Sequence, residues 1–353
     1  MKSKFMVVIL SVVLTFSAVM MVGCSGNGNS GYFTYTLSSD GTYYMVKLDN
    51  ASADGVKDIV LKSEYKGKPV VLAEKAFSEN DSIETVRIES SYKSLEKNTF
   101  FKCKNLKEVY VDGEINVSTR CFTYCDALEK ITFGDKIKLI DKICVFECNS
   151  LKSVVIGNSC KSIEGYAFKD CMTLESVDIG DSVIEIGEYA FAGCMSLSSV
   201  KFGKSLQTIG KSAFSQCVAL KELALPTQNV LTISDYAFEY VGLDELHIPA
   251  NLRLGEYSFG HLNWDYNMGL DGEGESRCKA VYFYSTEPTK EYLGTNSIGY
   301  TWDRTAADDA ELGDFYVYVP EGYESVYREL MINECDESWQ RCVINANKLR
   351  TFC

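Results

Sequence analysis

Residues 186–202 read IGEYAFAGCMSLSSVKF, residues 163–179 before them read IEGYAFKDCMTLESVDI, and residues 209–225 after them read IGKSAFSQCVALKELAL. The three segments start 23 residues apart and place apolar side chains at matching positions. Repetition with a fixed period of about 20–50 residues is typical of chains in which each repeat is one structural unit stacked on the next. This period predicts a solenoid.

Nine such units can be aligned between Leu72 and Phe283. Each opens on an aliphatic residue, followed four positions later by a small residue and then by Phe, except where Val145 replaces the Phe. The ladder of inward aromatic residues is clearest at Phe168, Phe191 and Phe214. Six units carry a cysteine three positions after this residue: Cys103, Cys125, Cys148, Cys171, Cys194 and Cys217.

The second half of each unit alternates apolar and polar residues, as in Val177-Asp178-Ile179. Alternation over a β-branched stretch is typical of a strand with one buried side. We therefore expect one short strand per unit, with strands of successive units stacked in parallel. The first half, with its Ile, Ala, Phe and Cys pointing inward, is expected to return through turns or helix-like backbone. A single unit has too small a core to fold without its neighbours.

These columns resemble the BspA-type leucine-rich repeats, a bacterial surface subclass of the leucine-rich repeat superfamily. The resemblance implies an α/β repeat solenoid: a right-handed coil with a parallel β-sheet of short strands, a β-rich N-terminal cap and a strand–helix C-terminal cap. Three substitutions depart from the pattern, namely Val145 for Phe and Asn80 and Val241 for Cys, and the ninth unit is interrupted. We expect these coils to be the least regular.

The repeats and the segments on either side of them predict how the chain is divided. Residues 32–71 form the N-terminal β cap, with a hairpin turning at SSDG (residues 38–41); residues 72–284 form the repeats, interrupted by 263–277; residues 285–353 form a C-terminal loop and cap. Polar loops are expected at 263–277 and 286–313. The cap comprises a strand at 315–320 and a helix with one apolar face, made by Tyr323, Val326, Tyr327, Leu330 and Met331.

The N-terminus has the features of an export signal. Lys2 and Lys4 precede an apolar run over residues 5–22 and the sequence MVGC ends at Cys24. This resembles a bacterial lipoprotein signal, which implies a signal peptide at 1–23, lipidation of Cys24 and a flexible tether at 24–31. An uncleaved membrane anchor and an ordinary cleaved signal are the alternatives. Each exports the chain, and the lipid would attach it, surface-exposed, to the cell membrane or outer membrane.

The composition and the motifs of the chain exclude several kinds of partner and active site. A formal net charge of −14 disfavours a nucleic-acid partner, and only two histidines are present. No nucleotide loop, G-x-S-x-G or H-E-x-x-H motif occurs, and the acidic run DGEGES (residues 271–276) lacks calcium-loop spacing. The sequence therefore indicates no catalytic residue, no metal and no cofactor, and we expect a monomer.

The chain has fourteen cysteines, and in an exported protein such a number favours disulfide bonds. The six ladder cysteines, and Cys121 and Cys144 in the small-residue column, are instead expected to be buried free thiols, since parallel side chains one coil apart are poorly placed to bridge. The states of Cys278, Cys335, Cys342 and Cys353 stay open, including a disulfide among the last three.

One outward residue per strand forms a stripe along the predicted sheet: Arg87, Tyr110, Thr132, Val155, Asp178, Lys201, Ala224, His247 and Tyr282. This stripe varies while the inward columns do not, as expected if the scaffold separates folding from recognition, although unselected surface positions would look the same. Aromatic and charged anchors dominate interfaces, so the candidate binding residues are Tyr110, Asp178, Lys201, His247 and Tyr282.

Three functions fit the sequence. The first is a non-catalytic, surface-displayed protein that binds protein or glycan; the family resemblance implies adhesion. The second is a component of the cell envelope that contacts other surface proteins without an external ligand. The third is a hydrolase acting through an insert loop.

Overall fold

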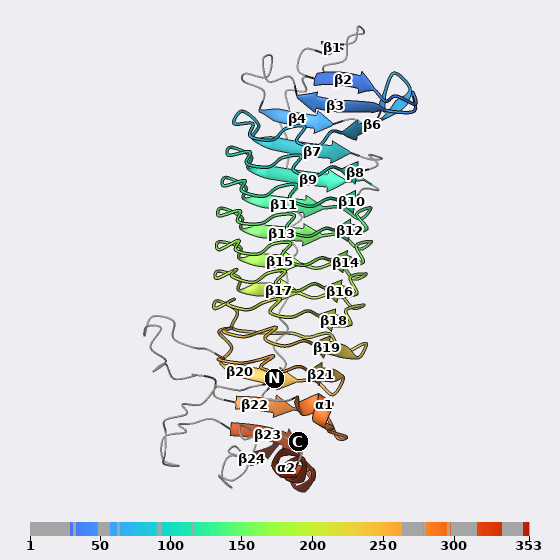
Figure 1. Cartoon of the computed structure of the whole chain (residues 1–353). Helices are drawn as coiled ribbons and strands as arrows, with labels where there is room; N and C mark the ends of the chain where they lie inside the picture. Colours follow the sequence, from blue (N-terminus) through green and yellow to red (C-terminus); the bar gives the residue numbers. More distant parts are fainter. Residues whose placement is uncertain are drawn as a thin grey trace, which may run out of the picture.

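The computed structural model describes residues 29–30, 33–48, 57–61, 64–89, 94–113, 116–262, 278, 280–294, 297, 316–333 and 349–352. Within these residues the chain winds as a β-solenoid whose coils stack along one axis (Figure 1). The expected repeat solenoid of stacked, parallel short strands is confirmed, although these strands form three sheets rather than the single expected one.

A thirteen-stranded sheet forms one side of the solenoid. Its short strands contain the aliphatic residues that open the repeats; Ile163 and Ile186, for example, are register partners. The expectation of one strand per repeat is therefore wrong, because these two-residue strands are too short to show alternation in sequence. The strands are β1 (Asn29–Ser30), β2 (Phe33–Leu37), β3 (Tyr44–Leu48), β6 (Lys68–Leu72), β8 (Ser94–Leu95), β10 (Asn116–Val117), β12 (Leu139–Ile140), β14 (Ser162–Ile163), β16 (Glu185–Ile186), β18 (Thr208–Ile209), β19 (Leu231–Ile233) and β21 (Leu252–Leu254), with β5 (Glu64–Tyr65) beside β6.

The alternating segments form the longer strands on a second side (Figure 1). Alternate residues of these strands point to the core and to the surface, as predicted. In β11, Ile131 and Phe133 are buried while Lys130 and Thr132 are half-exposed. A seven-stranded sheet contains β4 (Asp58–Leu61), β7 (Thr85–Glu89), β9 (Glu108–Asp112), β11 (Lys130–Phe133), β13 (Ser153–Ile156), β15 (Ser176–Asp178) and β17 (Ser199–Lys201). A four-stranded sheet contains β20 (Glu245–Ile248), β22 (Ala280–Phe283), β23 (Tyr316–Pro320) and β24 (Leu349–Phe352).

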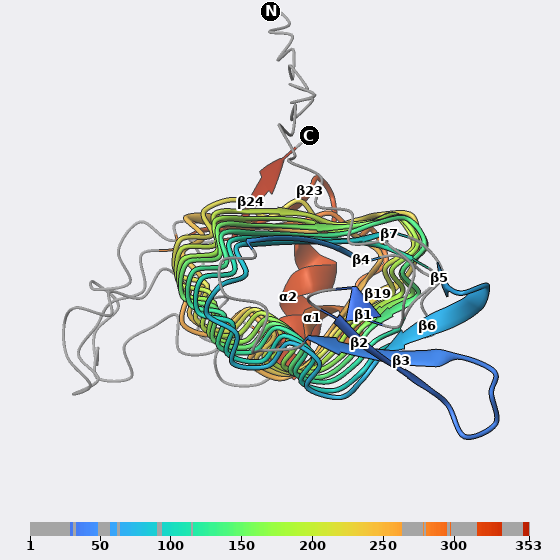
Figure 2. The same cartoon turned by 90° about the horizontal axis from the view of Figure 1, so that it is seen from above.

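Phenylalanines stack through the middle of the solenoid. Phe168, Phe191 and Phe214 are fully buried, with ring centroids 5.0 and 5.1 Å apart and nearly parallel planes. Viewed along the axis, successive coils follow nearly the same path around this shared interior (Figure 2). Each coil thus shields its neighbours from water, which is why the repeats need one another to fold.

The six ladder cysteines are buried free thiols, and each also makes a hydrogen bond. Their Sγ atoms donate to backbone carbonyls of the preceding coil over 2.9–3.4 Å, as Cys171 does to Val145 at 3.0 Å. Burial raises the pKa of the Cys103 thiol to about 12, so the reactive thiolate is scarce at neutral pH. A small apolar side chain that can also donate a hydrogen bond explains the choice of cysteine better than apolar size alone.

The irregular coil is not one that the substitutions predicted. Val145 is fully buried in a regularly paired coil, and in its place in the aromatic column Phe133 packs edge-on against Phe168 of the next coil, with centroids 6.3 Å apart. The sheet instead breaks between β17 and β20, where residues 222–225 form no strand. Gly134 and Gly157 each donate their N–H to the preceding coil at 2.7 Å, but the equivalent residue in this coil is Pro226, which has no N–H.

The N-terminal cap is a hairpin, as expected. β2 and β3 pair antiparallel, and the Asp40 carboxylate accepts hydrogen bonds from the Ser38 and Thr42 side chains in the turn between them. β3 also pairs in parallel with β6, so the hairpin continues the thirteen-stranded sheet directly. Part of the expected tether, Asn29–Ser30, forms β1 beside β2.

The C-terminal cap contains the expected strand β23 and the helix α2 (Glu324–Asn333). Tyr327 and Met331 of α2 are fully buried, but Val326 is 43% exposed, so the predicted apolar face was one residue too wide. The predicted loop at 286–313 also contains a short helix, α1 (Lys290–Leu293). Its N-terminus is capped by the Thr289 side chain, which accepts the N–H of Tyr292.

Candidate binding face

We define the long-strand face as the outward-pointing residues of the seven-stranded and four-stranded sheets. Strand register aligns these residues in a continuous row within each sheet. The row of the seven-stranded sheet is Val60, Arg87, Tyr110, Thr132, Val155, Asp178 and Lys201. The row of the four-stranded sheet is His247, Tyr282 and Tyr318. The stripe expected from the sequence therefore exists, with Ala224 in the unpaired segment between the two sheets.

Aromatic side chains gather at the C-terminal end of the face. The imidazole of His247 stacks on Tyr282 with centroids 4.6 Å apart, and Tyr282 stacks on Tyr318 at 4.5 Å. The Tyr284 hydroxyl lies 2.7 Å from Nδ1 of His247, and Glu245 lies 3.8 Å from Nε2. Because the rings stack face to face along the solenoid axis, this cluster presents ring edges and hydroxyl groups outward.

The middle of the face carries an ion pair. The Lys201 ammonium lies 2.9 Å from both carboxylate oxygens of Asp178 one coil earlier. Both side chains are well exposed, so the pair contributes little stability but fixes one positive and one negative group on the surface.

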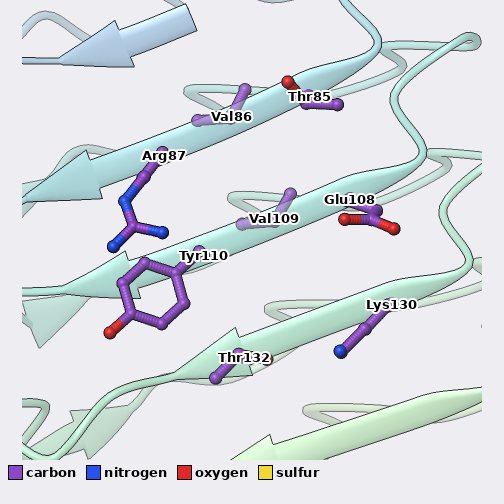
Figure 3. Close-up of a pocket in the computed structure, with 8 residues that line it drawn as sticks. All are labelled: Thr85, Val86, Arg87, Glu108, Val109, Tyr110, Lys130 and Thr132. Carbon is purple, nitrogen blue, oxygen red and sulfur yellow. The ribbon is translucent and has the colours of Figure 1, made fainter. Parts of the chain in front are cut away.

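A shallow hollow occupies the N-terminal part of the face (Figure 3). We call it the Arg87 hollow; its volume is ≈ 190 Å³ and it is lined by Thr85, Val86, Arg87, Glu108, Val109, Tyr110, Lys130 and Thr132. The guanidinium carbon of Arg87 lies 4.4 Å from the centroid of the Tyr110 ring, a cation–π contact between β7 and β9.

A row of alternating charge borders the hollow, just before the long strands. Glu84 is paired with Lys57 at 2.6 Å and with Lys107 at 2.7 Å, and Glu129 with Lys152 at 3.6 Å. Lys107 and Lys57 together lower the pKa of the Glu84 carboxyl to about 2. Opposite charges on consecutive coils thus neutralise one another along this edge.

The structure groups the five candidate residues into three separate sites. Tyr110 belongs to the Arg87 hollow, Asp178 and Lys201 form the ion pair, and His247 and Tyr282 belong to the aromatic cluster. Sequence reasoning missed Tyr318, because the strand YVYVP was interpreted only as a cap. Its alternation matches that of the repeat strands and was the available signal.

Several sequence predictions concern residues outside the described part of the chain. These include Cys24, the signal and most of the tether, the interruption at 263–277, and Cys335, Cys342 and Cys353. Among the residues that the structure describes, no group of three or more His, Cys, Asp or Glu side chains is arranged to hold a metal ion. In the same residues, no helix has both the length and the apolar character needed to cross a bilayer.

Stacked short parallel strands around a leucine- and phenylalanine-lined core define a leucine-rich-repeat solenoid. A family model described as the BspA type leucine rich repeat region matches residues 65–151 and 140–264, in six copies. The chain belongs to this BspA-type leucine-rich repeat family.

Solved structures similar to this chain include two bacterial leucine-rich repeat proteins. The protein from Bacteroides ovatus is 20% identical with a TM-score of 0.50, over 82% of this chain and 70% of that one. The protein from T. pallidum is 26% identical with a TM-score of 0.48, over 56% of this chain and 92% of that one. No curated protein matches the chain.

Proposed function

We propose that this chain is a non-catalytic binding protein displayed on a bacterial surface, and that its long-strand face contacts a protein or glycan partner in adhesion. The observation that carries the proposal is the contrast between the two sides of each long strand. Inward positions repeat aliphatic residues, whereas the outward row changes from Arg87 to Tyr110, Asp178 and His247. A rigid scaffold with varied exposed side chains separates folding from recognition.

The face also supplies suitable anchors. Tyrosine and arginine are enriched among residues that dominate binding energy, and Arg87 with Tyr110 and Tyr282 with Tyr318 form ordered pairs at its two ends. Ordering these side chains before binding reduces the entropy lost on association.

Export and attachment belong to the same proposal. Lys2, Lys4 and the apolar run before Cys24 support a lipid anchor that would hold the solenoid on the cell. Replacing Cys24 with alanine is expected to move the protein from the membrane fraction to the soluble or secreted fraction; an unchanged membrane fraction would favour an uncleaved anchor instead.

Alanine at Tyr110, Asp178, Lys201, His247 and Tyr282 together is expected to abolish partner capture, because truncating a single interface anchor already costs about 2 kcal/mol or more. The wild-type and variant chains are immobilised and exposed to host extracts and to extracts of the cell's own envelope. Capture from the first supports adhesion, whereas capture from the second alone supports an envelope component.

The matched control carries alanine at Glu188, Tyr189, Lys211 and Tyr257, which lie in the turns between the two sides of the solenoid and are half-buried or exposed. It is expected to retain capture. Circular dichroism first establishes that the five-residue variant is folded. If this folded variant captures partners as well as wild type does, the face is not the contact surface.

A further inference from the structure

The Arg87 hollow is lined by two cations and one carboxylate, on a face of an otherwise acidic chain. Arg87 lies over the Tyr110 ring at 4.4 Å, and this contact orders the planar guanidinium fork. Such a fork matches the two oxygens of a carboxylate, which a lysine ammonium cannot do alone.

The second cation, Lys130, lies in register with Glu108 on the neighbouring strand. Within the described residues, neither side chain forms an ion pair or a hydrogen bond. Elsewhere on this side, opposite charges one coil apart do pair, as Lys107 does with Glu84 and Lys201 with Asp178. The ammonium and the carboxylate in the hollow are therefore both available to a ligand.

The positive and negative side chains of the hollow select different parts of that ligand. Arg87 binds a carboxylate, and Lys130, at the other end of the hollow, donates hydrogen bonds to hydroxyl oxygens. Glu108 repels dense negative charge and accepts hydrogen bonds from hydroxyl groups. The Thr132 hydroxyl extends the same polar wall, whereas the Thr85 hydroxyl already donates to Asp58 at 2.5 Å. A group with one carboxylate and several hydroxyls satisfies all of these side chains at once.

We propose that the Arg87 hollow binds a single acidic sugar residue of a glycan, with its carboxylate on Arg87 at one end and its hydroxyls on Thr132 and, at the other end, on Glu108 and Lys130 (Figure 3). The volume of ≈ 190 Å³ is below the range of about 300–1,000 Å³ for drug-sized ligands and suits one sugar ring. This inference rests on the proposed function, because it names a ligand class for one end of the long-strand face.

An acidic peptide is the competing occupant, and Glu108 distinguishes the two. Replacing Glu108 with glutamine removes the repulsion that a run of carboxylates would meet, and it weakens the acceptor that sugar hydroxyls use. E108Q is therefore expected to bind an acidic sugar more weakly than wild type and to bind an acidic peptide more tightly.

The test titrates the purified full chain with glucuronate, N-acetylneuraminate, the neutral methyl ester of glucuronate and tri-glutamate, observed by ligand-detected NMR. At least one acidic sugar is expected to bind. The methyl ester of glucuronate is expected to bind at least about tenfold more weakly than glucuronate, because a charge-assisted hydrogen bond is lost. R87Q and K130Q should each weaken binding of the acidic sugar by about tenfold.

K204Q is the matched control, since Lys204 is an exposed lysine paired with Asp181 and does not line the hollow. It should leave binding unchanged. The inference is overturned if neither acidic sugar binds, if glucuronate and its ester bind equally, or if tri-glutamate binds more tightly than either sugar. Should sugar binding fail while the wild-type chain still captures a partner through the other face residues, the hollow is rejected and the proposed function stands.

Discussion

Replacing Phe191 with alanine is expected to lower the free energy of unfolding by about 3–5 kcal/mol. The Phe191 side chain is fully buried and stacks between Phe168 and Phe214 at 5.0 and 5.1 Å. Its removal deletes apolar contacts on both sides and leaves a cavity, because backbone hydrogen bonds fix the spacing of the neighbouring coils. Phe191 itself donates its N–H to Ala213 at 2.7 Å.

Urea-induced unfolding followed by circular dichroism measures this effect. The matched control is Phe101→Ala, because Phe101 lies half-buried in a turn and contacts Tyr124 only edge-on, at 5.7 Å. The control should lose less than half as much stability. Equal losses would mean that the aromatic stack is no more important than a peripheral ring contact.

Replacing Gly180 with alanine is expected to lower the free energy of unfolding by at least about 1–3 kcal/mol, although the change adds only one methyl group. A Cβ atom at Gly180 would lie 2.6 Å from the carbonyl carbon of Gly157 and 2.8 Å from the carbonyl oxygen of Ile156. Both are backbone atoms of the preceding coil and cannot rotate away. Glycine is needed here for close backbone approach.

Gly165→Ala is the matched control for this overpacking. A Cβ atom there would meet Glu188 at 3.0 Å from its Cγ and 3.1 Å from its backbone oxygen, distances that small adjustments relieve. The melting temperature of G165A should therefore fall less than that of G180A. A G180A variant as stable as wild type would show that the coils can separate locally without cost.

The repeat architecture could be predicted because its determinants are local and repeated. Burial of Ile131 and Phe133 in one strand and of Val154 and Ile156 in the next follows directly from alternation. The second set of strands could not be predicted in this way. Glu185–Ile186, for instance, supplies one inward and one outward residue, which is too little to show a period.

The break in the long-strand side falls in the coil where Pro226 stands at the position that Gly134, Gly157, Gly180 and Gly203 occupy in the preceding coils. Leu223 and Leu225 keep the apolar alternation of a strand, but Pro226 cannot donate a backbone hydrogen bond to the preceding coil, as Gly157 does to Phe133. The proline is the sequence feature that coincides with the irregular coil, and the substitutions at Asn80, Val145 and Val241 lie in other coils.

For the candidate site, the sequence predicted which residues point outward but not which of them meet. Arg87 and Tyr110 could be placed in neighbouring coils from the period alone. The contact between them depends on side-chain torsion angles, as does the hydrogen bond between His247 and Tyr284. The extension of the face to Tyr318 required the strand order of the C-terminal sheet.

Site-specific photo-cross-linking tests the central claim, that the long-strand face makes the contact with a partner. A benzophenone side chain is introduced at Tyr282 on this face or at Tyr189 in the connecting turns, and the chain is illuminated in the presence of the extract from which it captures a partner. The account predicts a cross-linked partner from position 282 and none from position 189. Cross-linking from position 189 alone would contradict it.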